Sequence, residues 1–340
     1  MKGMLFAVMT GVFALTATCL SLAPGETQVA GKTWMRYEHI SIDGETEYSG
    51  FGIARGYLVL SHRFTEKIGS QFTLDVYSSD KSADANGAGL KVKSAYLDYS
   101  LGENAKLYAG VIKNYFGMTY DWKYITIEKA MEDVLGIAPS ADAGIALSGK
   151  IPGGYGEYQV GVYNGEGYKK FYSNIDRHPA YQGNVRFKPI DNIAIGGSVK
   201  FENYDDPADT TGSPETLGQL DMAGVLIVEY GPVKLLGEYL GLSRDGDVSA
   251  GFMAMPIILL GDDFEIVGRY DSWDPNTEID DDGWTSITAG VNYFFARNSA
   301  DKPSAWVQAN WSREQLEVEN SEPVNTAGVQ LRWEFSSNPF

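Results

Sequence analysis

Short segments with one apolar and one polar face recur along nearly the whole chain, from Trp34 to Phe335. In each segment, apolar side chains alternate with polar or small ones, as in a β-strand that has one face in an apolar environment. The last segment shows the alternation most clearly, with Ala327, Val329, Leu331, Trp333 and Phe335 on one face and Thr326, Gly328, Gln330, Arg332 and Glu334 on the other. The pattern predicts an all-β protein of about sixteen strands.

The connections between these segments alternate between longer and very short. The very short ones are 65–67, 102–104, 152–154, 189–191, 231–232, 261–263 and 298–302, and the longer ones include 80–87, 113–141, 165–178, 204–216 and 274–283. A transmembrane β-barrel has tight turns on its periplasmic side and longer loops outside. The alternation therefore predicts a single transmembrane antiparallel β-barrel over residues 32–336, in a bacterial outer membrane.

Two segments depart from a simple strand pattern. The stretch from Leu90 to Tyr99 changes phase midway, which predicts a β-bulge or an apolar side chain in the interior. Pro256 lies inside an apolar segment, where its missing N–H removes one ladder hydrogen bond.

The N-terminus has the pattern of a secretory signal peptide. Lys2 precedes an apolar run from Met4 to Leu22, and small and polar residues follow. We assign residues 1–25 to this signal and leave the cleavage site open; a membrane-spanning anchor helix is the alternative. The only cysteine, Cys19, lies inside this segment, so the mature chain would have no disulfide.

The chain is acidic, with 27 basic and 45 acidic residues and a net charge of −18. This balance excludes nucleic acid as a partner, because phosphate binding needs a basic surface. The acids gather in the expected outer loops, such as 245–247 and 278–282. They form either a solvated surface or a divalent-cation bridge to lipid phosphates. The partners expected on this basis are the lipid bilayer and lipopolysaccharide.

Side chains alternate between the two faces of a strand, and this alternation places a set of basic side chains on the lumen side. The candidate pore-lining residues are Arg55, Arg63, Lys150, Arg186, Lys188, Lys200, Arg269 and Arg332. Facing lipid at mid-membrane would cost each roughly 2–4 kcal/mol. Inside the barrel they either pair with acids such as Glu202 and Glu334 or form a ladder that attracts anions.

The longest connection, 113–141, is the expected constriction loop. A structureless loop of this length is unusual without a function, so we expect it to fold into the lumen; an outer loop packed on itself is the alternative. A short helix is expected over 125–135. The candidate constriction residues are Lys113, Tyr115, Phe116, Tyr120, Lys123, Glu128, Lys129, Glu132 and Asp133.

Several short motifs in the first half of the chain carry a family resemblance. They are Ala95-Tyr96-Leu97-Asp98-Tyr99, Leu107-Tyr108-Ala109-Gly110, Lys113-Asn114-Tyr115-Phe116-Gly117, Ala141-Asp142-Ala143-Gly144-Ile145 and the stretch from Tyr158 to Gly167. In order and spacing, about residues 53–167 resemble the phosphate-selective porin O and P family of outer-membrane channels. The resemblance implies a trimeric, sixteen-strand diffusion channel with basic residues along its lumen. The chain departs from the family at Ser140, where members often carry a basic residue, and in its negative charge.

Features of an enzyme are missing from the sequence. His39, His62 and His178 are far apart and lack metal-ligand spacing. Ser61 and His62 are neighbours in a strand and point to opposite faces, so they cannot form a catalytic dyad. We expect no catalytic residue, metal or cofactor.

The sequence favours an outer-membrane porin, forming a homotrimer, for passive diffusion of small hydrophilic solutes, with inorganic anions such as phosphate as candidate solutes. Two alternatives stay open. One is a sugar channel whose inward aromatic side chains form a slide, with Trp34, Tyr57, Tyr77 and Trp306 as the candidates. The other is a structural or adhesive barrel with acidic, cation-binding loops.

Overall fold

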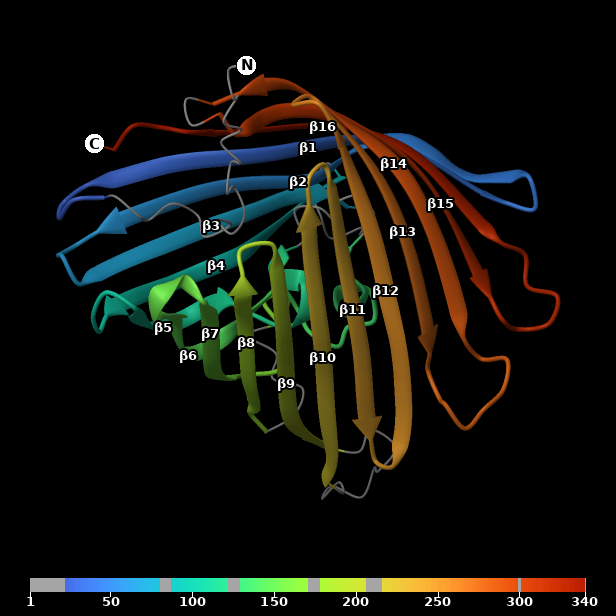
Figure 1. Cartoon of the computed structure of the whole chain (residues 1–340), viewed down its shortest axis with the longest axis horizontal. Coiled ribbons are helices and arrows are strands. Elements are labelled where there is room, and N and C mark those ends of the chain that lie inside the picture. Colours follow the sequence, from blue (N-terminus) through green and yellow to red (C-terminus); the bar gives the residue numbers. More distant parts are fainter. Residues whose placement is uncertain are drawn as a thin grey trace, which may run out of the picture.

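Sixteen antiparallel strands form one closed barrel, in which each strand pairs with its neighbours in sequence and β1 closes against β16 (Figure 1). The computed structural model describes residues 22–79, 87–121, 129–170, 178–205, 216–298 and 301–339. The predicted fold class and strand number are therefore confirmed. The predicted signal peptide falls largely outside the described residues.

The strands are long on most of the circumference and short around β5 to β8 (Figure 1). They are β1 (Thr27–Ile42), β2 (Glu45–Arg63), β3 (Ile68–Ser78), β4 (Ala88–Ser100), β5 (Ala105–Lys113), β6 (Ala141–Ile151), β7 (Gly156–Tyr163), β8 (Ala180–Ile190), β9 (Ile193–Asp205), β10 (Thr216–Tyr230), β11 (Val233–Arg244), β12 (Asp247–Leu260), β13 (Phe264–Asp274), β14 (Trp284–Arg297), β15 (Pro303–Leu316) and β16 (Val324–Ser336). The helical elements are η2 (Gly117–Asp121), α1 (Met131–Val134) and η3 (Pro152–Gly154). In the described part of the chain, no helix has the length and apolar character needed to cross a membrane.

The outer face of the barrel is apolar. In β14, for example, Ile287 and Val291 are exposed on the outside, whereas Thr288 and Asn292 are buried on the lumen side. Aromatic side chains meet near both ends of the strands, as Phe264 and Tyr293 do beside the tight turns. A closed sheet pairs every strand edge, which is the condition for crossing lipid with β-structure. The exterior is that of an outer-membrane barrel.

The tight turns of one side match the sequence prediction, but the loops of the other side do so only in part. Two connections there, expected to be longer, are two-residue turns: Asp43 and Gly44 join β1 to β2, and Asp245 and Gly246 join β11 to β12. All four residues have positive φ, as tight hairpin turns require. The strict alternation of long and short connections is therefore wrong at these two places. The β1–β2 hairpin projects from the barrel as paired strand instead of loop (Figure 1).

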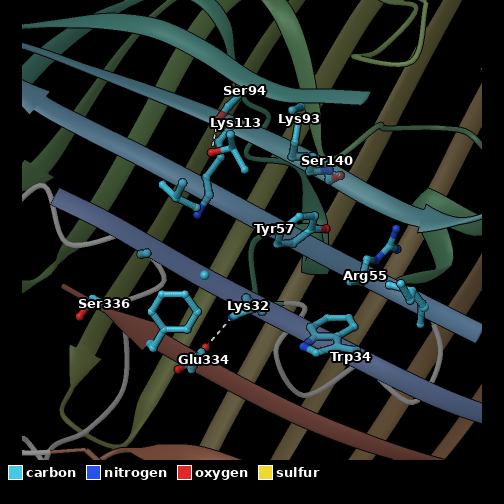
Figure 2. Close-up of a pocket in the computed structure, with 18 of the residues that line it drawn as sticks. Lys32, Trp34, Arg55, Tyr57, Lys93, Ser94, Lys113, Ser140, Glu334 and Ser336 are labelled. Atoms are coloured by element: carbon cyan, nitrogen blue, oxygen red, sulfur yellow. Dashed lines mark hydrogen bonds and ion pairs between the residues drawn. The ribbon is translucent and has the colours of Figure 1, made fainter. Parts of the chain in front are cut away.

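Both predicted strand irregularities are present. In the β3–β4 ladder Thr73 pairs with Ser94 and Leu74 with Val92, so Lys93 is the extra residue of a bulge. In β12, Pro256 pairs with β11, but the ladder to β13 is interrupted at Pro256. The bulge matters for function, because it turns both Lys93 and Ser94 toward the same lumen cavity (Figure 2).

Candidate functional site: a channel between loop 3 and one wall

The connection between β5 and β6, residues 114–140, is called loop 3 here, and its described parts lie inside the barrel. Phe116 and Met118 of the first part and Met131 of the second are at most 1% exposed. They pack on an apolar patch of the lumen face of β9–β13, formed by Ala194, Ala223, Val225, Ile227, Leu236, Leu240, Met253, Met255, Ile257, Val267 and Trp273. The prediction that this loop folds into the lumen is confirmed.

Three of the inward basic residues hold loop 3 in place. Arg186 donates to the carbonyl oxygen of Gly117 at 3.0 Å, Lys200 to that of Ile137 at 2.8 Å, and Arg269 to that of Lys129 at 2.9 Å. All three side chains are buried. They satisfy loop carbonyls that would otherwise be buried without a partner. The structure thus places Arg186, Lys200 and Arg269 beneath the loop and away from the open lumen.

Four other candidates also lie apart from the open lumen. Arg332 is 1% exposed, donates to Gln308, and stacks with its guanidinium carbon 4.5 Å from the ring centre of Trp34. Arg63 pairs with Asp98 at 3.3 Å. The remaining two, Lys150 and Lys188, lie at the tight-turn ends of β6 and β8. Arg63 and Arg332 are buried, so an inward position in a strand does not by itself place a side chain in the passage.

An open cavity of about 1210 Å³ runs between loop 3 and the wall formed by β1, β2 and β4 (Figure 2). The wall contributes Lys32, Trp34, Arg36, Arg55, Tyr57 and Lys93, and the loop side contributes Lys113, Tyr115, Lys129 and Asp133. Because loop 3 covers the opposite wall, the passage is eccentric. Of the eight predicted pore-lining residues, Arg55 alone lines it.

Basic residues outnumber acidic residues around this cavity. Its lining includes seven basic residues (Lys32, Arg36, Arg55, Lys93, Lys113, Lys129 and Lys302) and three acidic ones (Glu38, Asp133 and Glu334). Lys32 pairs with Glu334 at 2.8 Å, and Arg36 pairs with Glu38 at 2.9 Å. These two ion pairs engage two of the three acidic residues, and the lining as a whole is basic. Within the described ranges, Arg55 and Lys129 form no ion pair.

Lys93 is one of four basic residues of the cavity lining that sequence reasoning missed, with Lys32, Arg36 and Lys302. Its ammonium donates to the Ser140 hydroxyl and lies 3.9 Å from the ring centre of Tyr168. A lysine from β4 thus supplies an ammonium next to that serine. The phase change between Leu90 and Tyr99 predicted a bulge. A bulge alone does not show which additional side chain points into the lumen.

The predicted constriction residues divide into three groups. Lys113, Tyr115, Lys129 and Asp133 line the cavity. Phe116 and Glu132 are fully buried between the loop and the wall. Lys123 and Glu128 lie outside the described residues, as does the side chain of Tyr120.

The candidate aromatic slide is only partly in the passage. Trp34 and Tyr57 line the cavity, with Trp34 only 4% exposed. Trp306 lies on the other side of Arg332, and Tyr77 lies beneath the ammonium of Lys91. Among the residues whose placement is described, no three His, Cys, Asp or Glu side chains gather as metal ligands would.

Neither a family model nor a curated protein matches the sequence. Solved structures match the fold. Outer-membrane expressed OmpT of Vibrio cholerae has a TM-score of 0.65 and 11% identity, over 93% of this chain and 99% of that one. The anion-selective porin from Comamonas acidovorans has a TM-score of 0.62 and 13% identity, over 91% and 99%. OmpF of Salmonella typhi, in a complex with daunomycin, has a TM-score of 0.62 and 10% identity, over 92% and 98%. The chain is similar to these proteins in fold, and it has the porin architecture of bacterial outer membranes.

Proposed function

We propose that this protein is an outer-membrane diffusion channel that passes small hydrophilic solutes and favours anions. The observation that carries the proposal is the charge of the cavity, whose described lining has seven basic and three acidic residues. The chain as a whole has a net charge of −18, so the local excess runs against the overall balance.

The basic groups act on a solute from both sides of the passage. Arg55 and Lys93 project from the barrel wall, and Lys129 belongs to loop 3 opposite them. A narrow cavity with low-dielectric walls focuses the field of such charges and raises the local concentration of anions. The fork of the Arg55 guanidinium also matches the paired oxygens of an oxyanion. Several moderate contacts, instead of one deep site, allow an anion to leave again.

Inorganic oxyanions such as phosphate are the solutes we propose first. The sequence resemblance to the phosphate-selective porins supports this choice, and so does the fold shared with an anion-selective porin. The bilayer and lipopolysaccharide would surround the apolar exterior. A homotrimer is the proposed assembly, since one fold relative, OmpT of Vibrio cholerae folded in vitro, was solved in a trimer form.

A sugar channel with an aromatic slide is the second candidate. The observation in its favour is that Trp34 and Tyr57 line the cavity. Arg332 stacks on Trp34, which leaves little of that ring for a sugar to contact. The charge excess therefore weighs more than the aromatic surface.

The reversal potential of the purified protein in a planar bilayer under a KCl gradient tests the proposal. A potential of the anion-selective sign is expected. Cation selectivity with a conducting pore would leave the barrel as a general or sugar channel. Complete absence of conductance would support a structural barrel instead.

A further inference from the structure

Two glutamates meet beneath loop 3 and bind the same short turn. Glu132 belongs to α1 of the loop, and Glu238 projects from the lumen face of β11. The Glu132 carboxylate accepts the N–H of Thr119, and Glu238 accepts the N–H of Met118 at 2.7 Å. The two carboxyl groups are also in hydrogen-bonding contact with each other. The η2 turn is thus held by one carboxyl from the loop and one from the barrel.

The second oxygen of each carboxyl group has no donor from the protein. Oε2 of Glu132 and Oε2 of Glu238 are both buried, and neither receives a hydrogen bond from the described residues. Two ionised carboxylates have only acceptors to offer each other, and their charges repel. One proton between the groups would supply the missing donor and remove one of the two charges.

In the described part of the chain, no basic side chain forms an ion pair with Glu132 or Glu238. Arg269 of β13 acts on both carboxyl groups through its charge, but its guanidinium is bound to Asp271 at 2.7 Å and to the carbonyl oxygen of Lys129. Arg186 of β8 donates to the Gly117 carbonyl, and on β9 the Ser198 hydroxyl accepts the Gly117 N–H. The rest of the contact is apolar, formed by the cluster that includes Met118, Ala130 and Leu236.

We propose that Glu132 and Glu238 share one proton and together position loop 3, so that loss of this proton weakens the docking of the loop on the barrel wall. Both are positioning residues, since neither lines the cavity. The inference concerns the docking of the loop and holds whichever ion the channel prefers.

The direction of the pH effect follows from the two states of the loop. Burial raises the pKa of Glu132 from its ordinary 4.5 to about 7 in the docked loop. In a loop released into water, the carboxyl returns to its ordinary range. Between these two values the docked state holds a proton that the released state has lost. Docking is therefore strongest below about pH 4.5, weakens by up to roughly tenfold per pH unit through this window, and stays weak above about pH 7.

The experiment is amide hydrogen exchange of the purified, folded protein at pH 5 and pH 8, with rates corrected for intrinsic exchange. Peptides that contain Met118 and Thr119 report the two N–H groups that the carboxyls bind. We expect their protection to fall on the order of 10- to 100-fold at pH 8. The other loop anchors remain, so the loop loosens without leaving the barrel. Equal protection at both pH values would overturn the proposal.

A matched variant separates the shared proton from general packing. In Glu238→Gln the amide oxygen can still accept the Met118 N–H, and the amide NH₂ can donate permanently to Glu132. We expect this variant to keep at pH 8 the protection that the wild type has at pH 5. A pH profile like that of the wild type, or lower protection at both pH values, would contradict the shared proton.

Glu229→Gln is the control. Glu229 lies beside the β10–β11 turn and pairs with Lys234 at 3.0 Å, four positions along β11 from Glu238. This variant should retain the wild-type pH dependence. Loss of the pH dependence in Glu229→Gln as well would show that the effect does not arise at the Glu132–Glu238 pair. Reversal potentials play no part in this test, so its failure is distinguishable from failure of the anion preference.

Discussion

Two walls of the same lumen use basic residues in different ways. On the bare wall of β1, β2 and β4, Arg55 and Lys93 project into the open cavity. On the covered wall of β8–β13, Lys200 and Arg269 are buried and donate to carbonyl oxygens of loop 3. Both sets occupy strand positions on the lumen side of the sheet. The comparison shows that the path of loop 3, and not strand parity, decides which basic residues meet a solute.

The two walls also differ in how they stabilise their charges. Under loop 3, Lys200 pairs with Glu202 at 3.1 Å and with Asp221 at 3.0 Å, because a charge removed from water needs partners. The apolar patch beside them includes Leu236 and Leu240, whose burial contributes about 1.5–3 kcal/mol each. On the bare wall, Arg55 lines the open cavity and forms no ion pair with the described residues.

The largest effect should come from placing a charge on the covered wall. In Leu236→Asp, an ionised carboxylate without a partner would lie against Met118, at a cost above the roughly 2–7 kcal/mol of an unpaired neutral polar group. Loop 3 should leave the wall, and single-channel conductance should change markedly. Leu236→Met keeps the site apolar and should conduct as the wild type does. Unchanged conductance in Leu236→Asp would mean that the loop does not depend on this patch.

Removing a buried cation comes next in size. Lys200→Ala leaves Asp221 and Glu202 without their partner, and breaking a buried pair in this way costs about 3–5 kcal/mol. We expect a lower thermal unfolding temperature by circular dichroism, with the sign of ion selectivity preserved. A selectivity reversal at unchanged thermal stability would place Lys200 in the passage and not beneath the loop.

Removing a cation from the bare wall should act on selectivity and spare stability. A unit charge attracts an anion and repels a cation 4 Å away by about 1 kcal/mol each in water, so Arg55→Gln should lower the anion-to-cation permeability ratio by up to about 30-fold. Arg332→Gln removes an inward arginine that is covered by Trp34 and should leave the ratio close to that of the wild type. Equal shifts in both variants would remove the distinction between the two positions.

The smallest effect is that of salt on the wild type. Raising KCl from 0.1 to 1 M shortens the screening length from about 10 to about 3 Å. The anion preference should therefore decline toward unity, because it depends on solvated charges such as Arg55 and Lys129. Reversal potentials measured at a constant KCl ratio and increasing total concentration give the comparison. If the anion preference does not change with salt, the channel selects anions by direct contact with side chains and not by the electrostatic field of the lining charges.

The sequence predicted the barrel well because a strand repeats every two residues, so parity alone separates the lipid face from the lumen. It also located the bulge near Lys93, but it listed Phe116 among the constriction residues, whereas that side chain is fully buried against the wall. It could not predict which half of the lumen the loop would cover, since that depends on contacts such as Met118 with Leu236, more than 100 residues apart in the chain. Apolar residues on the lumen face of β10–β13 indicate where loop 3 packs. In the sequence, however, they cannot be distinguished from ordinary strand residues.

Cysteine accessibility tests the difference between the two walls most directly, since the only native cysteine, Cys19, lies in the predicted signal peptide. Single cysteines would replace Tyr57 on the bare wall and Val225 on the covered wall, and a charged thiol reagent would be added during single-channel recording. The account predicts rapid partial block of the Tyr57→Cys channel and an unaltered current through Val225→Cys. Equally fast block of both channels would contradict the cover by loop 3, and with it the assignment of the selecting residues.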